Sequence, residues 1–228
     1  ASAAPLEAMR QFYHDRLGLT VRAATDARLA LAAGTTELTF VAAAGGGAPF
    51  YHFAFNIPEN KLLAARAWQL ERSALIPPPE RLRDPAFPAD VVHFAHWNAH
   101  SLFFFDPAGN VVEYIARHDL DNAAPGAFGS GDILYASEIG LIVDDVPAAA
   151  AALKPIVGVE QYRGGDDQFL ALGDERGLLL VMKRGRILTL AAEPPKAAGV
   201  FPTLARVRGI RPADHVVPQF PYRIHVEA

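Results

Sequence analysis

The fold is indicated most clearly by residues 101–113, SLFFFDPAGNVVE, where two strand-like runs flank a tight turn. Residues 101–105 and 111–115 are rich in aromatic and β-branched side chains, as strands are. Between them Pro107 presets the φ of the turn, and Gly109-Asn110 tolerate left-handed backbone. Residues 101–115 are therefore predicted to form a β-hairpin.

Working outward, the same plan occurs twice. Before the hairpin come a strand at 52–57, a helix from Pro58 through Leu70, and a Pro-rich stretch, 77–88, predicted to be a loop. Further on, a strand at 138–143 precedes an Ala-rich helix that is capped by residues 144–147 and ends near Leu153, and a hairpin at 169–182 follows.

The two ends of the chain carry weaker copies of this unit. A helix is predicted at 6–18 from the helical spacing of its apolar residues, with Gly18 as its C-cap, and short strands follow up to residue 41. After a small-residue linker at 42–49, the complete units begin. Near the C-terminus, 203–207 and 222–226 resemble strands, whereas 191–198 and 211–221 look like loops.

The repeat predicts an α+β protein built from βαβββ modules whose curved mixed sheets pair and enclose a cleft. The first of two expected domains, 1–120, holds module one (1–44) and module two (50–118). The second, 132–228, holds module three (136–185) and a degenerate fourth module.

Composition narrows the functional classes. The chain is 51% hydrophobic and 20% charged with a net charge of −4, which indicates a globular protein and favours neither nucleic acid nor membrane as a partner. It has no cysteine, so any metal must be held by His, Asp, Glu or backbone oxygens. Residues 1–6 lack the features of a signal peptide, so a cytoplasmic location is expected.

Residues 51–57 and 101–113 together resemble the vicinal-oxygen-chelate superfamily of glyoxalases, bleomycin-resistance proteins and extradiol dioxygenases. They are similar to fosfomycin-modifying thiol transferases, in which a strand-opening His and the Glu after an Asp-Pro-x-Gly turn bind the metal. Carried over to this sequence, the resemblance implies His52 and Glu113 as ligands of Fe, Mn, Ni or Zn.

The resemblance implies a third ligand from the first strand of a partner module. In module three Glu138 stands where module two has His52, and Val181 stands where it has Glu113; in module one the matching position would precede Ala1. A His-Glu-Glu set and a two-ligand remnant both stay open. The alternatives are a core imidazole at His52, a solvent-facing Glu113 and a strand-edge charge at Glu138.

A second group of residues is predicted to contact the substrate. Trp97, Asn98 and His100 are expected at the cleft entrance; the alternative is an ordered loop packed on the sheet. The resemblance implies that Ser101 and Phe103 point inward. Phenylalanine where the thiol transferases carry a polar residue favours an apolar or aromatic ligand.

Two functional hypotheses follow from the resemblance. The first is a divalent-metal-dependent enzyme, a lyase, isomerase, transferase or dioxygenase, acting on a small oxygen-bearing substrate. The second is a metal-free protein that binds a small molecule or an antibiotic, as the bleomycin-resistance members do. A scaffold without a ligand is less favoured, and the modules can pair within one chain or across a homodimer.

Overall fold

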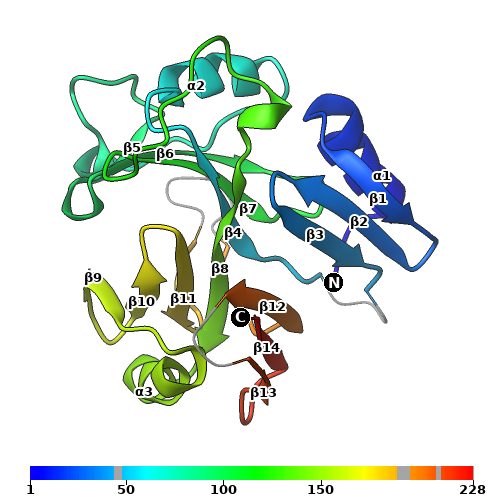
Figure 1. Ribbon diagram of the computed structural model, residues 1–228, viewed down its shortest axis with the longest axis vertical. Helices are drawn as coiled ribbons and strands as arrows, with labels where there is room; N and C mark the ends of the chain where they lie inside the picture. The colour runs from blue at the N-terminus through cyan, green and yellow to red at the C-terminus, as the bar shows by residue number, and fades with distance from the viewer. Residues whose placement is uncertain (44–47, 189–195, 209–211, 228) are drawn as a thin grey trace.

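The computed structural model describes residues 1–43, 48–188, 196–208 and 212–227, and Figure 1 traces their elements in chain order. Module one contains α1 (Leu6–Arg10), the π-helix η1 (Gln11–Arg16), β1 (Thr20–Ala24), β2 (Arg28–Ala33) and β3 (Thr36–Val41). Module two contains β4 (His52–Ile57), α2 (Leu62–Leu70), η2 (Glu80–Leu82), β5 (Val92–Phe94), η3 (Ala95–Trp97), β6 (Ala99–Phe105) and β7 (Val111–Arg117). After η4 (Ser130–Asp132), module three contains β8 (Tyr135–Val143), α3 (Val146–Val157), β9 (Gln161–Gly165), β10 (Phe169–Asp174) and β11 (Gly177–Lys183), and module four contains β12 (Thr203–Arg208), β13 (Ala213–Val216) and β14 (Tyr222–Glu227).

Modules two and three form one eight-stranded sheet with the strand order β5-β6-β7-β4-β8-β11-β10-β9. The first and last strands of each module pair in parallel, β4 with β7 and β8 with β11. The two modules meet where β4 runs antiparallel to β8. This α+β architecture agrees with the prediction, while the division of the chain into two domains at 120–132 stays a prediction because the sheet continues across that point.

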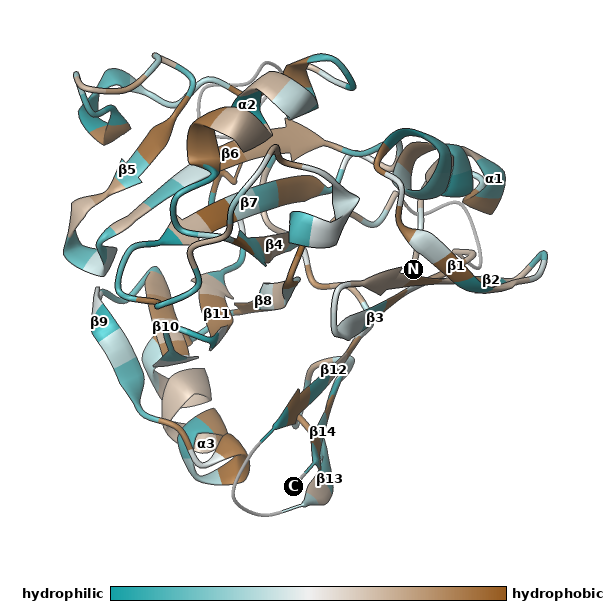
Figure 2. Ribbon diagram, turned by 45° about the horizontal axis from the view of Figure 1, so that its top comes forward, coloured by the Kyte–Doolittle hydropathy of each residue, from teal (hydrophilic) through white to brown (hydrophobic). Residues whose placement is uncertain are grey.

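Apolar layers cover the outer face of this sheet. In Figure 1, α2 lies above module two and α3 lies at the bottom, beneath module three. The outer face of module two packs against α1, η1 and the sheet of module one, and that of module three packs against α3 and module four. Figure 2 shows hydrophobic residues in brown along the strands and hydrophilic residues in teal on α1. No helix among the described residues is long and apolar enough to cross a bilayer.

The opposite face of the sheet, here called the inner face, carries Ala54, Ile115, Ile142 and Leu180. These residues alternate along their strands with residues of the outer core, as a pleated sheet requires. Each strand therefore divides its side chains between the helices on one side and the inner face on the other. The candidate site lies on the inner face.

The turn between β6 and β7 has the predicted structure. Gly109 has φ +74°, and the Asp106 carboxylate accepts hydrogen bonds from the amides of Ala108 and Asn110 at 2.9 Å each. The Tyr13 hydroxyl donates to the same carboxylate at 2.8 Å. The turn is thus fixed both locally and to the first helix, which explains why its sequence was so informative.

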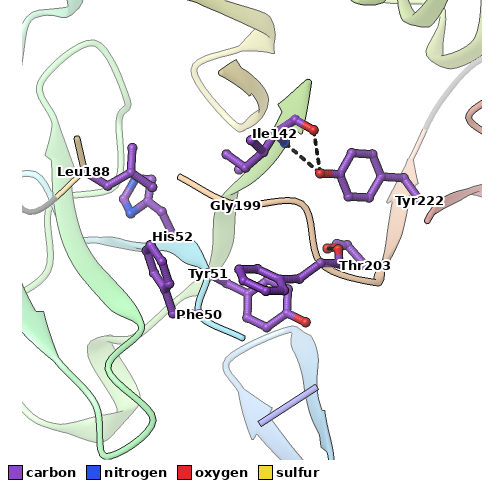
Figure 3. Close-up of a pocket in the computed structure, with 10 residues that line it drawn as sticks. Phe50, Tyr51, His52, Ile142, Leu188, Gly199, Thr203 and Tyr222 are labelled. Carbon is purple, nitrogen blue, oxygen red and sulfur yellow. Dashed lines mark hydrogen bonds between the residues drawn. The ribbon is translucent and has the colours of Figure 1, made fainter. Parts of the chain in front are cut away.

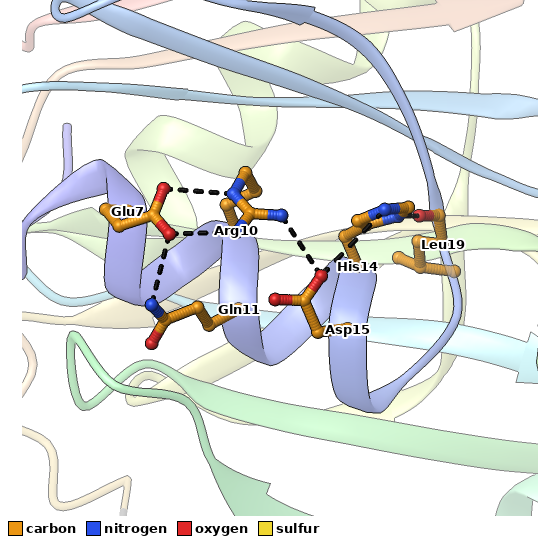
Figure 4. A network of polar contacts seen from close by, with 6 residues as sticks. All are labelled: Glu7, Arg10, Gln11, His14, Asp15 and Leu19. Atoms are coloured by element: carbon orange, nitrogen blue, oxygen red, sulfur yellow. Dashed lines mark hydrogen bonds and ion pairs between the residues drawn. The ribbon is translucent and has the colours of Figure 1, made fainter.

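The predicted helix at 6–18 forms as α1 continued by the π-helix η1. In the wider turns Leu17 donates its amide to the Phe12 carbonyl at 3.0 Å. Phe12, Tyr13 and Leu17 are all buried. The exposed side is held by Arg10, which donates to the carboxylates of Glu7 and Asp15 (Figure 4).

Three strands in the described part of the chain were not predicted. The prediction of a loop at 211–221 is wrong for β13, which pairs with β14 at the edge of the module-four sheet. Its side chains alternate between half-buried and exposed, so they show little apolar pattern. The edge strands β5 and β9 have only three and five residues, too few for an apolar pattern to stand out. The predicted linker at 42–49 and loop at 191–198 lie partly outside the described residues.

Module one is fixed to β8 through the turn between β2 and β3. The Thr35 amide donates to the Leu134 carbonyl at 3.0 Å, and the Ala136 amide donates to the Thr36 hydroxyl at 3.0 Å. Gly34 has φ +55°, and a β-carbon there would lie 1.9 Å from the Leu134 oxygen. Only glycine fits this close approach of the two backbones.

Gly34→Ala is therefore expected to lower the free energy of unfolding by roughly 2 kcal/mol or more, since left-handed strain and a backbone clash add together. Urea unfolding measures the change. Gly131→Ala is the matched control, because a β-carbon at Gly131 meets nothing within 4 Å. Equal stability of Gly34→Ala and Gly131→Ala would contradict the conclusion that the turn between β2 and β3 requires glycine at position 34.

Candidate functional site

The predicted metal ligands meet at the centre of the eight-stranded sheet. Glu113 on β7 and Glu138 on β8 both lie opposite Ala54 on β4, so these residues form a row on the inner face. His52 precedes Ala54 on the same face of its strand. Ligand atoms of His52, Glu113 and Glu138 all lie within 4.8 Å of one another, and the three residues are buried. The small side chain of Ala54 leaves room between the carboxylates.

The imidazole of His52 is oriented by the main chain of β7. Its Nδ1 lies 3.0 Å from the Val111 carbonyl oxygen, which can only accept, so Nδ1 carries the proton. Nε2 is then left with its lone pair, 3.4 Å from Oε2 of Glu113. Burial lowers the pKa of His52 to about 4, which keeps the ring neutral. A neutral imidazole with its other nitrogen bonded to a carbonyl is the usual form of a metal-binding histidine.

Glu113 is the least satisfied charged group of this row. Its side chain is 2% exposed, and Oε1 finds no hydrogen-bonding partner among the residues that the structure describes. Burial raises the pKa of Glu113 well above its usual range, and the nearby charge of Glu138 raises it further. The carboxyl therefore favours its protonated form unless a cation lies beside it.

Arg117 supplies the other charge on the inner face. This fully buried side chain forms an ion pair between its Nη2 and Oε1 of Glu138. Its guanidinium carbon lies 5.5 Å from the ring centre of Trp97 and 5.9 Å from that of Tyr162. Burial raises the pKa of Glu138, and the guanidinium opposes that rise. Arg117 thus compensates the negative charge of one of the two glutamates and leaves the other without a compensating charge.

A narrow pocket reaches His52 from the side of module four (Figure 3). Gly140, Phe201 and Tyr222 are among the residues that line it. The Tyr222 hydroxyl accepts from the Ile142 amide at 2.9 Å and donates to its carbonyl at 2.7 Å, so it anchors module four to β8. His52, Glu113 and Glu138 are here called the triad. Of these three residues His52 borders the pocket, and its side chain is 10% exposed.

The predicted substrate contacts separate into two groups. Ser101 and Phe103 lie on the inner face, where the Phe103 ring stacks on His52 at 5.9 Å between ring centres, and Trp97 packs nearby. His100 faces the opposite side of β6. Asn98 occupies an exposed left-handed turn and donates to Asp119 at 2.6 Å. The structure therefore does not bring His100 and Asn98 to the inner face, and a substrate-binding role for any of the predicted residues stays a prediction.

Comparison with known proteins relates this architecture to solved structures. No protein-family model and no curated protein matches the sequence. A candidate dioxygenase from Bacillus subtilis subsp. subtilis strain 168 matches with a TM-score of 0.52 and 17% identity over 84% of this chain and 63% of that chain. The chain has the vicinal-oxygen-chelate fold. It spans less than two thirds of the length of that structure.

Two further structures match less closely. Homoprotocatechuate 2,3-dioxygenase from Brevibacterium fuscum, solved with 3,4-dihydroxyphenylacetate, gives a TM-score of 0.37 at 17% identity, over 81% of this chain and 59% of that chain. The cppA protein from Streptococcus pneumoniae TIGR4 gives 0.36 at 12% identity, over 78% and 92% of the two chains. With TM-scores below 0.5, these two structures carry no argument about this chain.

The vicinal-oxygen-chelate fold raises the question of whether these residues suit a metal ion. They do: one neutral imidazole and two carboxylates offer nitrogen and oxygen donors to a divalent ion, and Glu113 holds an unpaired buried oxygen. A divalent cation would balance the charge that Arg117 leaves uncompensated. The buried triad could therefore bind a metal.

Sequence reasoning missed Arg117 and a second cluster of possible ligands, Asp84, His93 and His100. Arg117 had a usable signal, because residues 113, 115 and 117 of a strand share one face. Asp84 had none, since it lies in the Pro-rich stretch whose path the sequence does not indicate. His118 is half-buried, and its Nε2 lies 2.9 Å from Nδ1 of His100.

The raised pKa of Glu113 predicts a pH-dependent effect on stability in chelator-treated protein. Above the usual value of 4.5, the unfolded chain releases a proton that the folded chain keeps, so this group lowers stability as pH rises. Glu113→Gln removes that loss, about 1.4 kcal/mol for each unit of pKa difference. The variant should be more stable than the unchanged chain at pH 8, with a much smaller gain at pH 5.

Urea unfolding at the two pH values measures this difference. Glu37→Gln is the control, because Glu37 is an exposed partner of Arg28 and should give no such trend. A Glu113→Gln effect of the same size at pH 5 and pH 8 would contradict a protonated Glu113.

Proposed function

We propose that the chain is a divalent-metal-dependent enzyme whose metal is held by His52, Glu113 and Glu138. The observation that carries this proposal is the convergence of one imidazole and two buried carboxylates within 4.8 Å. Two carboxylates held this close in an apolar interior repel one another and favour a cation between them. Fe, Mn, Ni and Zn all accept such a donor set.

The substrate proposed for this site is a small molecule with two adjacent oxygens. When bound, the metal would act as a Lewis acid that polarises such oxygens. His52 presents Nε2 to the site and Arg117 balances negative charge near Glu138. Phe103 and Trp97 supply an apolar wall, which favours an aromatic or apolar body on the substrate.

The types of the three ligands favour some classes of reaction over others. Iron sites that activate dioxygen commonly use two imidazoles and one carboxylate. The inner triad has one imidazole and two carboxylates, which favours isomerase, lyase or transferase chemistry over ring cleavage. A small-molecule enzyme of this kind is compatible with a single chain or a homodimer.

A metal-free small-molecule-binding protein is the second candidate, and the Arg117–Glu138 pair favours it. This pair already satisfies the charge of one glutamate, and protonation would satisfy the other. The inner face would then hold an aromatic or antibiotic ligand by stacking on Trp97 and Phe103. The two candidates differ in whether a metal occupies the triad.

Metal analysis of the full-length chain purified without chelator separates them. We expect His52→Ala to remove one equivalent of bound divalent metal per chain, because the site loses its only imidazole. His225→Ala is the matched control, since His225 lies on β14 beside Asp214, away from the triad. Equal metal content in the unchanged chain and in His52→Ala, after incubation with Zn²⁺ or Mn²⁺, would support the binding protein instead.

A further inference from the structure

A second cluster of ligand atoms lies on the outer face of module two, on the other side of the sheet from the triad. His93 on β5 and His100 on β6 are directly paired residues of neighbouring antiparallel strands. Asp84 joins them from the loop between η2 and β5. One ligand atom of each residue lies within 4.8 Å of the others. Three separate segments of the chain therefore converge on one point.

The carboxylate of Asp84 is aimed at the two imidazoles by its own turn. Oδ1 accepts a hydrogen bond from the Ala86 amide at 2.9 Å. This leaves Oδ2 at 3.2 Å from Nε2 of His100 and 3.9 Å from Nδ1 of His93. The Phe87 ring stacks on His100 at 4.1 Å between ring centres, which fixes the loop against the strand. The oxygen that faces the histidines is thus positioned before any ligand arrives.

A chain of polar contacts runs from Glu59 through His118 and His100 to Asp84. Oε2 of Glu59 lies 3.1 Å from Nδ1 of His118, and Nε2 of His118 lies 2.9 Å from Nδ1 of His100. Carboxylates only accept, and two neutral imidazoles carry two N–H protons, so the three contacts of this chain cannot all be hydrogen bonds. In the form in which His118 donates to Glu59 and His100 donates to His118, Nε2 of His100 presents a lone pair to Asp84.

With neutral rings, one contact of the chain lacks a proton. Where that contact is the 3.2 Å approach of His100 Nε2 to the Asp84 carboxylate, a metal ion between the two acceptors supplies the missing positive charge. His93 brings a second imidazole within reach; its ring lies parallel to that of His100 with ring centres 4.5 Å apart, so one ring must turn for both imidazoles to bind a single ion. A single proton serves one imidazole, whereas a metal ion serves both imidazoles and the carboxylate.

The cluster is open on one side. The side chains of His93 and Asp84 are 31% and 23% exposed, while that of His100 is 9% exposed. Water can therefore complete the coordination of a bound ion. Two imidazoles and one carboxylate suit borderline divalent transition ions such as zinc, which bind nitrogen and oxygen in this combination.

We propose that Asp84, His93 and His100 form a second binding site for a divalent transition metal ion, with His118 and Glu59 positioning His100. The site binds its ion independently of the inner triad, because no ligand is shared and the sheet separates the two. The bound ion links the Pro-rich loop, on which Asp84 lies, to the edge of the sheet. A hydrogen-bonded partner behind a ligating imidazole is the usual arrangement at metal sites.

Calorimetric titration of the metal-free, full-length chain with Zn²⁺ tests this site. In the His52→Ala background, which disables the inner triad, one equivalent should still bind. Adding His93→Ala should weaken that binding by about 100-fold or more, since one of three protein ligands is lost. Adding His96→Ala instead should leave it unchanged, because His96 is exposed and lies outside the cluster.

Failure of the inner site and failure of the outer site give different results. Zinc binding that His52→Ala abolishes would overturn the outer site and leave the inner one standing. If His93→Ala does not weaken the zinc binding that remains in the His52→Ala background, the outer site is overturned as well. If His52→Ala does not fold, the comparison of His93→Ala with His96→Ala is made in the unchanged chain, where His93→Ala alone should remove one equivalent.

The positioning role of His118 has its own readout. His118→Ala should lower zinc affinity about tenfold, because His100 loses the acceptor for its Nδ1 proton. The visible absorption of Co²⁺ bound in place of zinc should shift with it, whereas a purely structural contact would leave the spectrum unchanged. Unaltered affinity and spectrum would remove His118 and Glu59 from the site.

Discussion

The antiparallel pairing of β4 with β8 is the contact on which the rest of the architecture depends. Without it, modules two and three would each expose an unpaired strand edge. With it, they share one sheet, and Glu113 and Glu138 reach the same place from different modules because both lie opposite Ala54. Neither module alone contains the triad. The candidate centre is thus a product of how two repeats join.

That junction concentrates charge in an apolar interior. Two carboxylates, an imidazole and a guanidinium are buried on the inner face, where unpaired charge is strongly disfavoured. Arg117 balances Glu138, while Glu113 depends on a proton or a cation. The outer cluster solves the same problem differently, because its partly exposed residues keep contact with water. The two faces of one sheet therefore present donor sets of different charge and accessibility.

Much of this architecture was predictable from local signals. The turn after Phe105 and the repeat of helix and hairpin follow from spacing, glycine positions and strand alternation, whereas the convergence of His52 with Glu113 was implied by the resemblance to the superfamily. The edge strands were not predictable, because a short half-exposed strand has almost no apolar pattern. The path of the loop carrying Asp84 was hidden too, since proline-rich segments show no periodicity and their contacts are long-range. Arg117 could have been found from its alternation with Glu113.

One feature of β8 bears on how such a protein can diversify. Its ladder with β4 ends at Ile139, and beyond that point a tyrosine hydroxyl from module four, rather than a strand, meets the main chain at Ile142. The entrance to His52 is consequently walled by side chains. Gly140, where a β-carbon would lie 2.5 Å from the end of Met182, sits at its rim. Because side chains border this entrance, single replacements at its rim change the width of the entrance while the strand ladder beneath stays intact.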